Sequence, residues 1–136
     1  MLEIEVGGAR FEARLEDGAA PHTVAAFRRL LPLESKLIHA RWSGEACWIP
    51  FGELDVGVGA ENATAYPAPG QLLLYPGGVS ETEILFPYGA TLFGSKMGQL
   101  AGNHFATIHD GNDRLKDLGE LVLWRGAQEI SFKTAE

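Results

Sequence analysis

The chain has 136 residues, of which 46% are hydrophobic, 17 are glycine and one is cysteine, and its formal net charge is −7 at pH 7. This length suits one domain with a core of its own, spanning residues 1–136, and the single cysteine excludes an internal disulfide. The negative charge disfavours nucleic acid as a partner, because binding it usually requires a basic patch. No apolar run has the length of a signal peptide or a membrane span, so we expect a soluble, cytoplasmic protein without a membrane partner.

The chain opens with a predicted hairpin followed by a helix. Apolar and charged residues alternate over 2–6 and again over 11–15, with two glycines between the two runs, which is typical of paired strands. The segment PHTVAAFRRLLP begins at Pro21 and carries apolar residues at helical spacing. It predicts a helix of about three turns that Pro32 stops.

The segment Leu37–Pro50, LIHARWSGEACWIP, predicts a second hairpin. With a two-residue turn at Ser43-Gly44, His39 lies opposite Trp48 and shares one face with Arg41. A guanidinium beside an indole and an imidazole suits a polar ligand. The alternative is a solvated face on which Arg41 covers the Trp48 ring. The opposite face carries the apolar set Ile38, Ala40, Cys47 and Ile49.

This register also bears on the lone thiol. It places Cys47 and His39 on opposite sides of the sheet, which argues against a Cys47 nucleophile activated by His39, provided that the turn is where we place it. A buried unpaired cysteine usually behaves as a small hydrophobic residue, and burial raises a thiol pKa. We therefore expect Cys47 to be a core residue.

The rest of the chain predicts short strands and one more helix. Residues 52–70 form a long irregular connection, which is either a functional loop or a surface excursion. Short strands at regular spacing are typical of a barrel or a sandwich. Strands are predicted over Gln71–Tyr75, Glu83–Tyr88, Asn103–His109, Glu120–Trp124 and Gln128–Phe132, and a helix near Asn112–Leu118.

The order of these elements resembles the cyclophilin fold, a closed antiparallel barrel capped by two helices. Three motifs carry the resemblance: APHTVAAFRRLL in the first helix, IHARW, which is similar to the strand that holds the cyclophilin catalytic arginine, and FATIHDG from Phe105. The resemblance implies a mainly β, cyclophilin-like barrel with two short helices. It also makes Arg41 the counterpart of the catalytic arginine.

The chain departs from working prolyl isomerases around that arginine. Ala46 and Ile49 stand near the positions of the usual pocket phenylalanine and glutamine, and Trp48 is the candidate replacement for the apolar wall. Glu83 stands where cyclophilins have a glutamine, and His104 matches a pocket histidine in one alignment. Together with the hairpin face, this gives a predicted ligand-binding set of His39, Arg41, Trp48, Glu83 and His104, with Arg41 as the candidate catalytic residue.

Over its whole length the chain resembles more closely an uncharacterised bacterial family assigned a cyclophilin-like fold, on the phrases LIHARWSGEACWIP, LYPGGVSETEILFPYG and GQLAGNHFATI. We favour a binding module or weak enzyme for a small polar molecule or short peptide on the Arg41 face. The alternatives are a divergent prolyl isomerase and an accessory protein that acts through its surface or as a homo-oligomer. Fold analogy alone is a weak guide to function.

No cofactor and no metal are expected. The four histidines, at positions 22, 39, 104 and 109, lack the close helical spacing of a zinc motif, and Cys47 has no partner cysteine. A metal site would require His39, His104 and Glu83 to converge from three separate strands.

Overall fold

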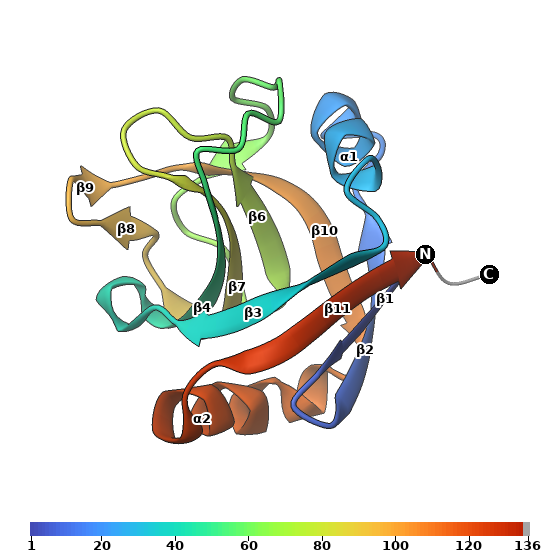
Figure 1. Ribbon diagram of the computed structural model, residues 1–136, viewed down its shortest axis with the longest axis vertical. Helices are drawn as coiled ribbons and strands as arrows, with labels where there is room; N and C mark the ends of the chain where they lie inside the picture. The colour runs from blue at the N-terminus through green and yellow to red at the C-terminus, as the bar shows by residue number, and fades with distance from the viewer. Residues whose placement is uncertain (135–136) are drawn as a thin grey trace.

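Eight strands of the computed structural model close into one antiparallel barrel (Figure 1). The structure describes residues 1–134. Within them the strands pair in the order β2-β1-β11-β3-β4-β7-β6-β10, and β10 pairs again with β2, which closes the sheet. The mainly β barrel with two helices that the sequence predicts is therefore confirmed. The barrel strands are β1 (Leu2–Val6), β2 (Ala9–Leu15), β3 (Leu33–His39), β4 (Gly44–Gly52), β6 (Gln71–Tyr75), β7 (Thr82–Thr91), β10 (Gly102–Asp110) and β11 (Gln128–Thr134).

Shorter elements connect the barrel strands. Figure 1 shows the two helices on opposite sides of the barrel, and the β8–β9 hairpin projecting away from it. Neither helix of the described residues is long and apolar enough to cross a membrane. These elements are α1 (Pro21–Arg28), α2 (Leu115–Arg125), the 3-10 helices η1 (Arg41–Ser43) and η2 (Asn112–Arg114), and the strands β5 (Ala63–Thr64), β8 (Gly94–Ser95) and β9 (Gly98–Gln99).

The core lies inside the barrel, where alternate side chains of each strand meet. Phe27 of α1 enters the barrel, and its ring centroid lies 4.7 Å from that of Phe105 and 5.7 Å from that of Phe132. All three rings are fully buried. The first helix is therefore part of the core and covers one opening of the barrel.

α1 is shorter than the predicted helix. Its start is held by Glu61 from the long loop, whose carboxylate accepts hydrogen bonds from the Thr23 backbone N–H and hydroxyl at 2.8 and 2.7 Å. A carboxylate at this end satisfies free N–H groups and favours the helix dipole. The helix ends at Arg28 because the chain must then enter β3, where Leu33 pairs with Phe132.

α2 occupies the place of a strand predicted over Glu120–Trp124, so that prediction is wrong. Leu115, Leu118 and Val122 are buried at helical spacing, which is the pattern of a helix with one face on a core. The sequence LVLW within the helix has the composition of a short buried strand, and four residues are too few to reveal the helical period. The helix predicted near Asn112–Leu118 corresponds to η2 and the beginning of α2.

A second apolar cluster lies on the outside of the barrel, over β4, β7 and β6. Phe93 and Leu100, which flank the β8–β9 hairpin, pack onto it, and the Phe93 ring centroid lies 5.9 Å from that of Tyr75. This outer cluster removes from solvent the outward side chains that a barrel usually exposes. It comprises Ala40, Ala46, Leu73, Tyr75, Leu85, Phe93 and Leu100, with Trp48 packed against it.

Candidate functional site

The hairpin that contains Arg41 has a different turn from the predicted one. Ile38 pairs with Trp48 and His39 with Cys47, so the predicted register is wrong by one residue. A longer connection through η1 replaces the two-residue turn. It is tied to a remote segment, because the Ser43 hydroxyl and the backbone of Gly94 exchange hydrogen bonds of 3.3 and 3.1 Å. Sequence rules for turns consider only neighbouring residues, so they cannot predict a contact with Gly94.

The shift moves His39 to the other side of the sheet. Residues directly opposite one another share a face, so His39 points inward with Cys47, and Trp48 stays outside. Although Cys47 now lies on the same face as His39, it does not become a nucleophile. Cys47 is fully buried, and burial raises its thiol pKa to about 12. Cys47 is thus a core thiol, as expected, although the register behind that expectation is wrong.

A pocket of about 250 Å³ opens where the end of β3 and η1 meet β7 and α2. We call it the Arg41 pocket. It brings together two of the predicted site residues, His39 and Arg41, with side chains from remote segments. Its lining comprises His39, Arg41, Gly44, Glu45, Tyr88, Glu120 and Leu123.

His39 and Tyr88 form a hydrogen-bonded pair in this pocket. The His39 Nε2 atom lies 2.7 Å from the Tyr88 hydroxyl, and the rings meet edge to face with centroids 5.6 Å apart. Burial and the nearby Arg41 guanidinium lower the pKa of His39, whereas burial raises the pKa of Tyr88. Both groups are therefore neutral at pH 7, and His39 Nδ1 is buried without a hydrogen-bond partner among the described residues.

Two glycines make room for pocket side chains. A Cβ atom on Gly119 of α2 would overlap the Tyr88 ring, and one on Gly89 would overlap the Glu45 carboxylate. Glycine weakens a helix interior by about 1 kcal/mol relative to alanine. Gly119 therefore lowers the stability of α2 but leaves the space that the Tyr88 ring occupies. A glycine inside a helical pattern is the sequence signal that points to a close approach here, and our prediction did not use it.

The charged walls of the pocket do not neutralise one another. Among the described residues no carboxylate forms an ion pair with Arg41, although Glu45 and Glu120 line the same pocket. Glu45 accepts a hydrogen bond from the backbone N–H of Ala90 at 2.9 Å, and Glu120 accepts one from the Trp124 indole at 2.9 Å. Each contact uses one oxygen of its carboxylate.

Trp48 and Glu83, two more predicted site residues, lie outside the barrel rather than in the Arg41 pocket. Trp48 pairs with Leu85, two positions from Glu83, and Glu83 lies between Pro50 and Tyr75 of the flanking strands. Glu83 is only 3% exposed, and its Oε2 atom and the indole Nε1 of Trp48 are both buried without a hydrogen-bond partner among the described residues. Burial, with a contribution from Glu81, raises the Glu83 pKa to about 8.

His104 lies in a third environment. It pairs with Leu73 of β6, and its Nε2 atom lies 2.7 Å from the Thr107 hydroxyl, which donates to Glu16 at 2.6 Å. Desolvation lowers the His104 pKa. Within residues 1–134 no three histidine, cysteine or carboxylate side chains gather to hold a metal ion. The five predicted ligand-binding residues therefore occupy three separate places: His39 and Arg41 share the Arg41 pocket, Trp48 and Glu83 lie near one another on the outside of the barrel, and His104 lies apart from both.

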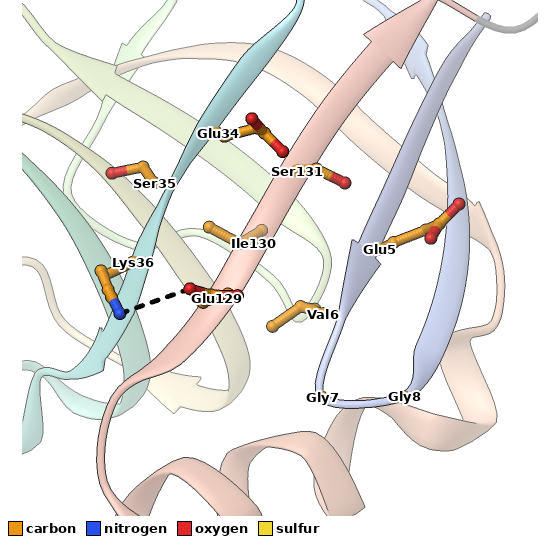
Figure 2. A pocket seen from close by; sticks show the side chains of 10 residues that line it. All are labelled: Glu5, Val6, Gly7, Gly8, Glu34, Ser35, Lys36, Glu129, Ile130 and Ser131. Atoms are coloured by element: carbon orange, nitrogen blue, oxygen red, sulfur yellow. Dashed lines mark ion pairs between the residues drawn. The ribbon is translucent and has the colours of Figure 1, made fainter.

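A wider groove of about 490 Å³ follows β11 between β1 and β3 (Figure 2). Figure 2 shows Glu34, Ser131 and Glu5 spread along it, with Lys36 paired to Glu129 at 3.7 Å. None of the buried unpartnered atoms of the described residues belongs to its lining. It has the features of a solvated acidic surface, so we place the candidate site in the Arg41 pocket.

The long loop of residues 52–70 is anchored near its middle. The Glu61 backbone N–H donates to Asn103 at 3.0 Å, and the Asn103 amide donates to the carbonyl of Gly59 at 2.8 Å. Together with the carboxylate that holds α1, these contacts make this part of the loop a structural brace on the side of the barrel opposite α2 (Figure 1).

With this geometry in place, comparison with protein families gives a clear assignment. The model of DUF3830, described as a protein of unknown function, matches residues 2–134. The chain belongs to the DUF3830 family. A comparison with curated proteins gives no match.

Two solved structures show what this DUF3830 chain is similar to. A structure of McbB in complex with tryptophan superposes with a TM-score of 0.75 at 18% identity, covering 98% of this chain and 44% of McbB. The solution structure of the hypothetical protein AF2241 from Archaeoglobus fulgidus gives a TM-score of 0.61 at 22% identity, covering 98% of this chain and 93% of that one. The chain thus spans less than half the length of McbB. At these identities both likenesses concern the fold, and the cyclophilin resemblance stays a prediction.

Proposed function

We propose that this DUF3830 chain binds a small polar molecule in the Arg41 pocket, with an anionic group of the ligand on the Arg41 guanidinium. The observation that carries the proposal is the convergence, in one cavity of about 250 Å³, of the Arg41 guanidinium, which pairs with no carboxylate of residues 1–134, and the neutral His39–Tyr88 pair. Ligand sites typically combine a concave shape with a few well-placed polar groups. The volume of this cavity lies below the range typical of pockets for drug-sized ligands, which favours a small metabolite over a protein as the ligand.

The pocket is better suited to binding than to covalent chemistry. Cys47 lies on the inward side of the same hairpin, but its thiol keeps its proton at neutral pH because its pKa is raised to about 12. Tyr88 also stays protonated, since its pKa is raised. A guanidinium offers a rigid fork of donors that matches a carboxylate or phosphate. Recognition of an anion is therefore the role that these side chains support best.

The test is a titration followed by amide and side-chain NMR shifts. The probes are inorganic phosphate, isocaproate and tryptophan, the last because McbB was solved in complex with it. We expect at least one probe to shift the signals of His39, Arg41 and Tyr88 with a dissociation constant in the range of about 1 mM or tighter.

The matched variants are Arg41→Gln and Arg29→Gln. Both remove one exposed guanidinium, but Arg29 follows α1, on the far side of the barrel from α2 (Figure 1). Binding should be lost in Arg41→Gln and kept in Arg29→Gln. Equal binding by the two variants, or no shift with any of the three probes, would overturn the proposal.

A further inference from the structure

The charges around the Arg41 pocket have opposite signs. Arg41 contributes a guanidinium, and Glu45 and Glu120 contribute two carboxylates to the same lining. Among the described residues, no ion pair joins Arg41 to either carboxylate. A ligand with both charges can therefore meet both walls at once.

The carboxylate of Glu45 is held in place. Its Oε1 atom accepts the Ala90 backbone N–H at 2.9 Å, and the side chain lies so close over Gly89 that a Cβ there would meet both its Cβ and its Cδ at 2.9 Å. This seat keeps the carboxylate beside the pocket instead of letting it swing to the guanidinium. The Oε2 atom of Glu120 accepts a hydrogen bond from the indole of Trp124, one turn further along the same helix.

We propose that the pocket selects a small zwitterion, an α-amino acid, whose carboxylate lies on Arg41 and whose ammonium group lies against Glu45 and Glu120. This inference rests on the proposed function and names its ligand class. The half-buried Leu123 supplies an apolar wall for the side chain of the amino acid. The neutral His39–Tyr88 pair supplies hydrogen-bonding groups without adding a further charge.

The experiment compares three molecules that share the isobutyl side chain of leucine by calorimetric titration of the full chain: leucine, its deaminated carboxylate isocaproate, and its decarboxylated amine isoamylamine. Leucine should bind about tenfold more tightly than either of the others, because each lacks one charged hydrogen-bonding group. Glu120→Gln and Glu45→Gln should weaken leucine binding and leave isocaproate binding equal or stronger. Glu129→Gln, a charge-matched change on the exposed face of β11, should alter neither.

The outcomes separate this inference from the proposed function. If isocaproate binds as tightly as leucine and still requires Arg41, the inference that the pocket selects a zwitterion is wrong, while the proposed binding of an anion at Arg41 stands. If isoamylamine binds as tightly as leucine, or if leucine binding is unchanged in both Glu45→Gln and Glu120→Gln, the zwitterion is overturned. If none of the three molecules binds, the inference is overturned, and the phosphate and tryptophan titrations decide the fate of the proposed function.

Discussion

Replacing Glu83 by glutamine is expected to flatten the pH dependence of stability near neutrality. Glu83 is buried between Pro50 and Tyr75 and forms no ion pair within residues 1–134, and burial raises its pKa from 4.5 to about 8. The folded protein therefore keeps a proton that the unfolded chain releases. Where the folded state binds more protons, the free energy of unfolding falls as pH rises. The contribution of this carboxyl is complete below pH 4.5 and is lost progressively up to about pH 8.

The size of the effect follows from that window. Each pH unit inside it changes the free energy of unfolding by up to about 1.4 kcal/mol. Between pH 5 and pH 7 the wild type should thus lose roughly 2–3 kcal/mol through Glu83. Glutamine does not titrate, so the variant lacks this slope. A constant difference caused by burying the amide cancels when slopes are compared, as do the contributions of His39 and His104, which both proteins share.

The assay is urea unfolding at pH 5, 6 and 7, followed by tryptophan fluorescence. Glu81→Gln is the control, because Glu81 is exposed and only two residues away on the chain. It should reproduce most of the wild-type slope. If wild type and Glu83→Gln show the same slope between pH 5 and pH 7, the carboxyl is ionised in the folded state and the argument from burial fails.

Three further predictions address other parts of the fold. Gly119→Ala should destabilise the protein by about 1–3 kcal/mol in urea unfolding, since crowding of Tyr88 outweighs the better helix propensity; a more stable variant would show that the ring moves aside freely, and Lys116→Ala is the control. Glu61→Gln should lower the urea midpoint at pH 7, and the difference should vanish as pH falls from 4.5 towards 2, because hydrogen bonds from Thr23 hold the Glu61 pKa at about 2; a difference that persists at the lowest pH would contradict this. NMR exchange of an Ala-Pro peptide should not be accelerated beyond its uncatalysed relaxation of roughly 10–100 s, because Arg41 shares its pocket with carboxylates instead of an apolar proline seat; acceleration that Arg41→Ala abolishes would establish the isomerase alternative.

The strands of the barrel could be predicted because burial on one face imposes a period of two. The alternation in residues 2–6 and 11–15 survives in β1 and β2. The run predicted over Gln71–Tyr75 is β6 with identical bounds, but its signal is a continuous apolar composition, because β6 is buried on both faces. Glu120–Trp124 failed for the complementary reason. Its apolar residues contact the barrel from a helix, and over five positions such a face and a buried strand have the same composition.

The candidate site was harder to predict because it depends on contacts between remote segments. The sequence places His39 and Arg41 together on a hairpin face, and they do share a pocket, but through a turn whose geometry depends on Gly94. Tyr88 and Glu120 reach that pocket from β7 and α2, and no local pattern relates them to Arg41. Trp48 was separated from His39 by a register difference of a single residue.

The position of β11 has a consequence for the order in which the barrel can assemble. β11 lies between β1 and β3 and pairs with both, although about ninety residues or more separate it from each of them along the chain. During synthesis, the edges of β1 and β3 must therefore stay open until Gln128–Thr134 has left the ribosome. Open edges invite pairing with other chains. A nascent chain halted before β11 is consequently exposed to aggregation, and β11 is the strand whose pairing joins β1 to β3.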